Sequence, residues 1–144
     1  MDKGIIHPNA SISKLIFGSL LFMSLGIVLE LYLLGHFEGI LQAIPILCIS
    51  TSIFLVVTLW FKTSRLLIKL FQIFLTISAL SGLYGVFLHL QANYEFESEI
   101  NSRDGFWQHF TDSFFGALPV LAPGSMILFA LIGYVYLLMI KQKQ

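Results

Sequence analysis

This sequence has few charged residues, and their charges cancel. Of its 144 residues only 11% are Asp, Glu, Lys or Arg, eight acidic and eight basic, whereas 57% are hydrophobic. A soluble domain carries roughly 25% charged residues, so this chain has too few to cover a surface in water. Without net charge or a clustered basic surface, binding to nucleic acid is not expected. We therefore expect the lipid bilayer to be its main partner.

Cysteine and recognised catalytic motifs are also scarce. Cys48 is the single cysteine and lies in an apolar run, so no intrachain disulfide can form. Metal motifs such as HExxH and the EF-hand loop are absent. His109 and Asp112 are close in sequence, but the neighbouring Ser113 belongs to no nucleophile motif. The sequence does not decide whether the protein is an enzyme, and it favours a non-enzymatic role.

Four long apolar runs are the main feature that the sequence does have. They occupy residues 15–35, 41–61, 70–90 and 120–140, each 21 residues long. As a helix such a run reaches about 31 Å, close to the roughly 30 Å hydrocarbon core of a bilayer. Isolated spans in lipid must be helical, because their backbone groups find no water there. The sequence predicts one all-α integral membrane domain, residues 1–144, an up-down bundle with spans at about 15–35, 41–61, 66–90 and 120–140.

The basic residues are concentrated on one side of this arrangement. Threading four spans places Arg103 on one side and the other seven on the opposite side: Lys3, Lys14, Lys62, Arg65, Lys69, Lys141 and Lys143. The positive-inside rule then puts both termini in the cytoplasm. Six carboxylates, at 38, 95, 97, 99, 104 and 112, are expected outside. The pattern resembles small four-span proteins of the bacterial inner membrane, which implies that location.

The external segment 91–119 is the only sizeable part expected outside the membrane. Within it, FWQHFTDSFFGAL has aromatic residues at 106, 107, 110, 114 and 115, spaced as on one side of a helix. This spacing predicts a short amphipathic helix in the membrane interface before the fourth span, with its aromatic side chains at head-group depth.

Polar side chains gather at the outer ends of the first and third spans. His36 and Glu38 lie in GHFEG after the first span, and His89 lies near the end of the third. The first and third helices of an up-down bundle are diagonal across its core. The two imidazoles are therefore expected at similar depth, where they can ligate one divalent metal ion or a haem.

The residues after His89 can complete a metal site in two ways. If the third span stays helical, His89, Asn93 and Glu97 form one stripe with mixed nitrogen and oxygen donors. If the chain becomes extended, Glu95, Glu97 and Glu99 share a face, which suits a hard cation such as calcium. The candidate ligands are thus His36, Glu38, His89, Asn93, Glu95 and Glu97. The alternative is that these groups only bind loop backbone and water.

Glu30 is the one carboxylate expected inside a span, between one and two turns from its outer end. A carboxylate at that depth costs a few kcal/mol on insertion scales and usually faces the interior of a bundle. We interpret Glu30 as the strongest single functional candidate. A near-interface residue bonded to Tyr32, Tyr84 or another helix is the alternative.

Three functions follow from these patterns. The first is a non-enzymatic accessory or assembly subunit, whose acidic extracytoplasmic face meets another membrane protein or a second copy. The second is a haem- or metal-binding membrane protein that uses His36 and His89. The third is a small ion- or proton-coupled transporter in which Glu30 titrates within the membrane.

Overall fold

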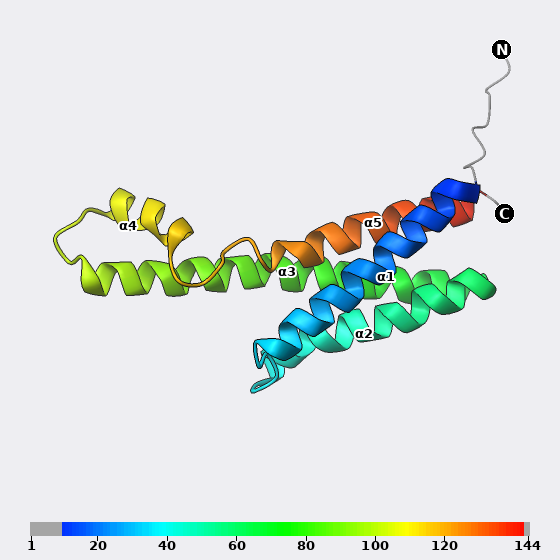
Figure 1. The fold of residues 1–144 in the computed structure, drawn as a ribbon, viewed down its shortest axis with the longest axis horizontal. Helices are drawn as coiled ribbons and strands as arrows, with labels where there is room; N and C mark the ends of the chain where they lie inside the picture. Colours follow the sequence, from blue (N-terminus) through cyan, green and yellow to red (C-terminus); the bar gives the residue numbers. More distant parts are fainter. Residues whose placement is uncertain (1–9, 143–144) are drawn as a thin grey trace, which may run out of the picture.

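The chain forms five α-helices and one short 3₁₀ helix in the computed structural model, which describes residues 10–142 (Figure 1). They are α1 (Ala10–Leu33), α2 (Ile40–Phe61), α3 (Arg65–Ile100), α4 (Phe106–Asp112), η1 (Ser113–Phe115) and α5 (Gly124–Lys141). The helices α1, α2, α3 and α5 are long and apolar enough to cross a membrane. The predicted all-α four-span architecture is confirmed. Lys3 and Lys143, which belong to the predicted basic side, lie outside the described residues.

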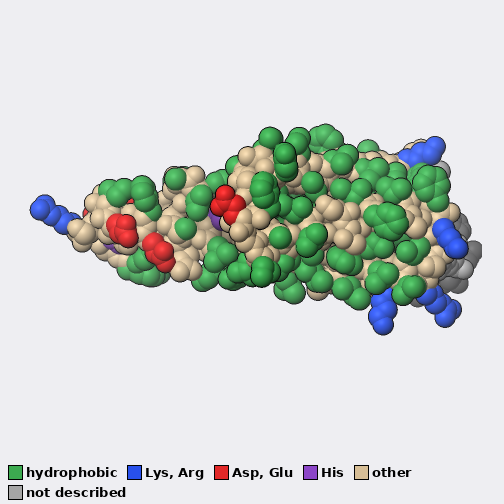
Figure 2. Space-filling view, turned by 90° about the horizontal axis from the view of Figure 1, so that it is seen from below, with side chains coloured by type: hydrophobic (Ala, Val, Ile, Leu, Met, Phe, Trp, Pro, Cys, Tyr) green, Lys and Arg blue, Asp and Glu red, His purple; other side chains and the backbone are tan. Residues whose placement is uncertain are grey.

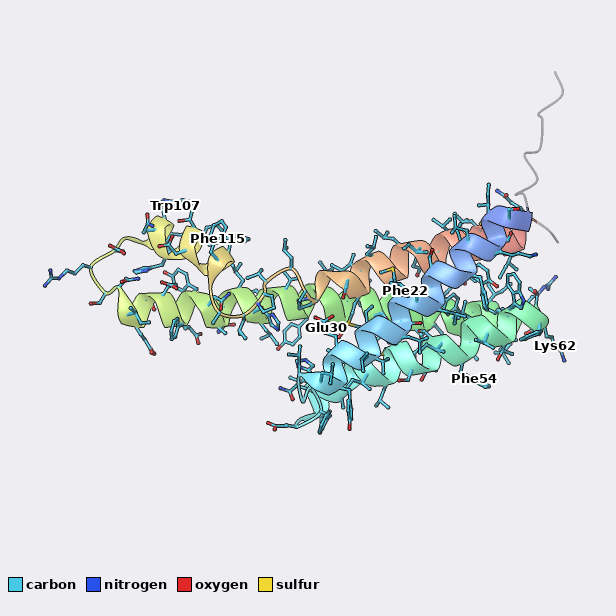
Figure 3. The ribbon with its side chains drawn as sticks, viewed as in Figure 1. Phe22, Glu30, Phe54, Lys62, Trp107 and Phe115 are labelled. Atoms are coloured by element: carbon cyan, nitrogen blue, oxygen red, sulfur yellow. The ribbon has the colours of Figure 1, made fainter. Side chains whose placement is uncertain are left out.

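The four long helices form a bundle in which each contacts two neighbours. Backbone contacts join α1 to α2, α2 to α3, α3 to α5 and α5 to α1, and no other pair of these helices within the described residues. Hence α1 and α3 are diagonal, as expected for an up-down bundle. All four helices contribute to the apolar core, which contains Leu20, Ile27, Ile49, Val56, Phe71, Leu75, Phe129 and Leu137. Other large apolar side chains, such as Phe22 and Phe54, point outward (Figure 3).

Local signals explain where α1 ends and α3 begins. Gly35 has a φ of 65°, and the N–H groups of Gly35 and His36 donate to the carbonyls of Tyr32 and Leu31. This is the Schellman arrangement, which a glycine in the left-handed region permits. The side chain of Ser64 caps α3 by accepting from the N–H of Leu67 at 3.2 Å.

The helix α3 is much longer than a membrane span. It continues to Ile100 as a single helix of 36 residues, about 54 Å at the standard rise. The sequence left open whether the chain after Leu90 is helical or extended, and it is helical. Figure 1 shows α4 and η1 returning along this outer part of α3, and both contact it. We call residues 91–118, which extend beyond the bundle, the protrusion.

Two prolines delay the start of the last helix. The predicted fourth span begins at residue 120, whereas α5 begins at Gly124. Pro119 and Pro123 lack backbone donors, and residues between them form turns, with the N–H of Ala122 donating to the carbonyl of Pro119 at 3.1 Å. Pro123 then occupies the N-cap position of α5.

Charge is separated along the long axis of the molecule. Figure 2 shows basic side chains at the wide end of the bundle and acidic ones on the protrusion and at its junction with the bundle, with one basic side chain at the tip. The wide end carries the described basic residues Lys14, Lys62, Arg65, Lys69 and Lys141, at or near helix ends. The described ends of the chain also lie there (Figure 1).

Candidate functional site

A partly open cavity of about 650 Å³ lies between the α1–α2 hairpin and the α3–α5 pair. Residues from the last turns of α1, from the hairpin loop, from the start of α2, from the middle of α3 and from the segment before α5 line it. In Figure 1 the α1–α2 hairpin diverges from α3 at this end of the bundle. The cavity is therefore at the end of the four-helix region from which the protrusion extends.

Small residues hold one wall of the cavity together. A Cβ atom added at Gly82 would lie 2.8 Å from the carbonyl oxygen of Pro123, and one at Gly85 would lie 2.8 Å from the Cβ of Pro123. The segment before α5 therefore approaches α3 more closely than a larger residue would allow. The α1–α2 hairpin contacts this pair of helices through α2 on α3 and α1 on α5, and its loop end diverges from α3 (Figure 1), where the cavity lies.

Four of the residues singled out from the sequence line this cavity. Glu30 comes from the last turn of α1, His36 from the hairpin loop, and His89 and Glu95 from α3. Figure 3 shows Glu30 between α1 and α3. Among the described residues it forms no hydrogen bond or ion pair. His36 and His89 thus line the same cavity, and their use as ligands of one ion or haem stays a prediction.

The two imidazoles interact electrostatically. Partial burial, and secondarily the charge of His89, lower the pKa of His36 below its usual 6.5. Both effects disfavour the protonated form. His36 is therefore neutral at pH 7, and its nitrogen lone pair is available.

A hydrogen bond to a backbone carbonyl orients the imidazole ring of His89. Its Nδ1 lies 3.1 Å from the carbonyl oxygen of Pro119. A carbonyl only accepts, so Nδ1 carries the proton in this bond. In the neutral ring Nε2 is then the acceptor, which is the tautomer of many metal-ligating histidines.

The other three residues of the predicted metal site do not line the cavity. Glu38 is in the hairpin loop, where its backbone N–H donates to the side chain of Gln42 at 3.1 Å. Glu97 accepts a hydrogen bond from the side chain of Asn101 at 3.2 Å. Among the described residues no three His, Cys, Asp or Glu side chains come together as potential metal ligands.

The side chain of Asn93 forms hydrogen bonds to the protein backbone. Its Nδ2 donates to the carbonyls of Ser113 at 2.9 Å and Leu118 at 2.8 Å, and its Oδ1 accepts from the N–H of Leu118 at 3.0 Å. The side chain is buried. The stripe that begins at His89 and Asn93 thus holds the returning segment 113–119.

The sequence reasoning missed the helix face that forms the polar wall. Ser81, Tyr84, Leu88, Gln91 and Glu95 all line the cavity. Their spacing of three or four residues is that of one helix face. This signal was present, but it crosses the predicted end of the span at residue 90, so only a continuous helix reveals it.

The remaining missed groups come from other elements. Gln42 of α2 and Ser125 of α5 line the cavity, and the Pro119 carbonyl orients His89. No single-sequence pattern points to a backbone carbonyl, so this contact depends on the tertiary structure.

Comparisons with protein families, with characterised proteins and with solved structures find no match for this chain.

Proposed function

We propose that this small multi-pass membrane protein is a non-enzymatic accessory or assembly subunit that contacts a partner through its protrusion. The observation that supports this most is the set of exposed aromatic side chains beyond the bundle. Trp107 is 74% exposed and Phe115 is 90% exposed, and Figure 3 shows both on the side of α4 and η1 that faces away from α3. Exposed aromatic clusters typically mark interaction surfaces.

Acidic residues belong to the same protrusion as this aromatic surface, and they favour a partner with a basic patch. Glu97, Glu99, Asp104 and Asp112 belong to the protrusion, and no ion pair neutralises them among the described residues. Electrostatic complementarity of this kind selects partners and speeds their association. The proposed partner is the extracytoplasmic side of another membrane protein, or a second copy.

The charge separation supports a bacterial inner-membrane protein with the basic end in the cytoplasm. All described basic residues except Arg103 are at the end of the bundle opposite the protrusion. By the positive-inside rule that end faces the cytoplasm, and the protrusion is then extracytoplasmic.

Photo-crosslinking in cells tests the docking proposal. A benzoylphenylalanine side chain at position 115 or 107 should give one discrete protein adduct, and the change Glu99→Lys should abolish it. Position 54 is the matched control, because Phe54 is 69% exposed but belongs to the bundle, and it should give only lipid adducts. Lipid adducts alone from 107 and 115 would show that the aromatic surface enters the head-group layer instead.

A second candidate function is a haem or metal centre at His36 and His89. The shared cavity and the fixed tautomer of His89 favour it. A haem would suit the site better than a bare ion, because His36 and His89 would be enough to hold its iron, whereas a bare ion needs more ligands. A Soret band in the gently purified protein that disappears in His36→Ala and His89→Ala would support it, and its absence together with metal-free elemental analysis would refute it.

A proton-coupled carrier that uses Glu30 is a third proposal, supported by the position of this carboxylate in the cavity. Flux into liposomes that is unchanged by Glu30→Gln would remove its central residue.

A further inference from the structure

The geometry points to a binding site for a lipophilic organic cation in the cavity between the α1–α2 hairpin and the α3–α5 pair, with Glu30 as the residue that binds the charge. The inference is independent of the docking surface, which lies on the protrusion. It follows from three properties of the cavity: its charge, its walls and its size.

The charged residues that line the cavity are acidic. Two carboxylates, Glu30 and Glu95, line it, and no Lys or Arg does. Glu95 accepts a hydrogen bond from the side chain of Gln91 at 2.8 Å, which leaves its charge in place. His36 is neutral at pH 7 and does not compensate. A positively charged guest therefore fits the cavity better than an anion.

Glu30 is the less stabilised of the two carboxylates. It lies in the last turn of α1, where the helix dipole is negative and disfavours an acidic group. It has no hydrogen-bond or ion-pair partner among the described residues. Its side chain is exposed and lines the cavity, so it is accessible to a cation, whose charge would offset the unfavourable interaction with the helix dipole.

The walls favour an organic cation over a bare metal ion. Most of the lining is apolar, including Leu31, Leu34, Leu88 and Met126. Tyr84 also lines the cavity, and an aromatic face attracts cations. A divalent ion needs several oxygen or nitrogen ligands at once, and no group of three is assembled in the described part of the chain.

The volume agrees with a guest of moderate size. Small-molecule sites typically enclose about 300–1,000 Å³ with apolar walls and a few polar groups, and this cavity has about 650 Å³. A quaternary cation or protonated amine with an apolar body meets each of these conditions.

Two probes of matched shape and opposite charge test the proposal. The purified protein, in phosphatidylcholine nanodiscs, is titrated with tetraphenylphosphonium and with tetraphenylborate, and empty nanodiscs correct for partition into lipid. Saturable binding is expected for the cation alone. Equal binding of both ions would overturn the proposal, because it would reflect lipophilicity without charge selection.

Variants locate the site. Glu30→Gln keeps the size of the side chain and should weaken binding of the cation about tenfold. Glu38→Gln removes a carboxylate from the same hairpin that does not line the cavity, and it should leave the affinity unchanged. Equal affinity of Glu30→Gln and the wild-type protein, or a loss in Glu38→Gln alone, would contradict the assignment.

A second variant separates loss of binding from loss of the fold. Ala92 lines the cavity from α3 and is exposed, so Ala92→Trp should obstruct the cavity without changing its charge. Binding should be lost while the helical circular dichroism and the elution volume stay as in the wild type. Undiminished binding in a folded Ala92→Trp protein would place the cation elsewhere.

Discussion

The amide of Asn93 organises the protrusion at the scale of a single residue. Its three hydrogen bonds tie α3 to Ser113 and Leu118. Gly116 is matched to it, because a Cβ there would lie 2.5 Å from the Cγ of Asn93. The segment that follows α4 can therefore pass directly over this side chain, and Pro119 is carried to His89.

Replacing Asn93 by alanine should release this segment. The backbone groups of Ser113 and Leu118 would lose their partners. Ser113 is buried whereas Leu118 is exposed, so the main cost is the unpaired Ser113 carbonyl, about 1–3 kcal/mol. Limited proteolysis should then cleave within residues 101–123 much faster than in the wild-type protein. Asn101→Ala is the control, because Asn101 is exposed and its side chain bonds only to Glu97. Equal cleavage rates in both variants would contradict the role of Asn93.

The pKa of His36, in the hairpin loop, depends on His89, which lies on α3 across the cavity. Burial is the larger cause of its lowered pKa, and His89 adds to it. The change His89→Gln should therefore raise the pKa of His36 toward 6.5 without restoring it fully, which an NMR titration of the imidazole can follow. An unchanged pKa would exclude the coupling to His89, and a full return to 6.5 would exclude burial as the main cause.

The lowered pKa of His36 makes its contribution to the free energy of unfolding depend on pH. Between the unfolded pKa of about 6.5 and the lower folded pKa, the unfolded chain binds more protons than the folded one. The contribution of His36 to the free energy of unfolding therefore falls as the pH is lowered through this window. In the His89→Gln variant the folded pKa of His36 should be closer to 6.5, so this pH window is narrower. The decrease in the free energy of unfolding between pH 6.5 and 5, measured by thermal unfolding, should therefore be smaller than in the wild-type protein.

At the scale of elements, the contact between α3 and α5 depends on glycine. Gly133 faces the side chain of Leu75, whose Cδ2 would clash with any Cβ at that position, and Gly82 faces the backbone before α5. A polar contact adds to this packing, since the hydroxyls of Thr76 and Tyr134 lie 2.7 Å apart. Other residues of α3 and the start of α5 line one wall of the cavity.

Gly82→Ala should weaken this contact. The new Cβ would meet a backbone oxygen at 2.8 Å, which cannot move as a side chain does, so overpacking should lower the free energy of unfolding by about 1–3 kcal/mol. Gly18→Ala is the matched control, because nothing lies within 4 Å of a Cβ there. That change should be neutral or raise stability by up to about 1 kcal/mol, as alanine favours helices. Thermal unfolding in detergent compares the two variants.

Elements differ in how far the sequence predicts them. Four spans follow from apolar runs alone, because lipid leaves the backbone no alternative to the helix. The length of α3 does not follow, since the polar residues after Leu90 suit a helix or a strand and the contacts with α4 and η1 lie far along the chain. Glu30 and the two histidines could be found as polar groups at the outer ends of spans. Gln42 and Ser81 could not, because only the packed bundle turns them toward one cavity.

At the scale of the whole molecule, the protrusion and the cavity lie at the same end. The cavity is lined by the hairpin loop and by α3 up to Glu95, and the protrusion, which carries acidic side chains (Figure 2), begins at the same level. A negative field at the entrance raises the local concentration of cations. The basic residues are at the other end, so the two ends differ in what they attract.

This separation predicts one orientation in the membrane, which cysteine labelling can measure. In a Cys48→Ser background, Ser102→Cys marks the turn after α3 and Thr63→Cys marks the loop between α2 and α3, and both positions are exposed. Because the residues around position 63 are basic, the positive-inside rule predicts a cytoplasmic location for that loop. An impermeant maleimide should therefore label position 102 in spheroplasts, and position 63 only after the membrane is permeabilised. The reverse pattern would place the protrusion in the cytoplasm, and with it both the cavity entrance and the proposed docking surface.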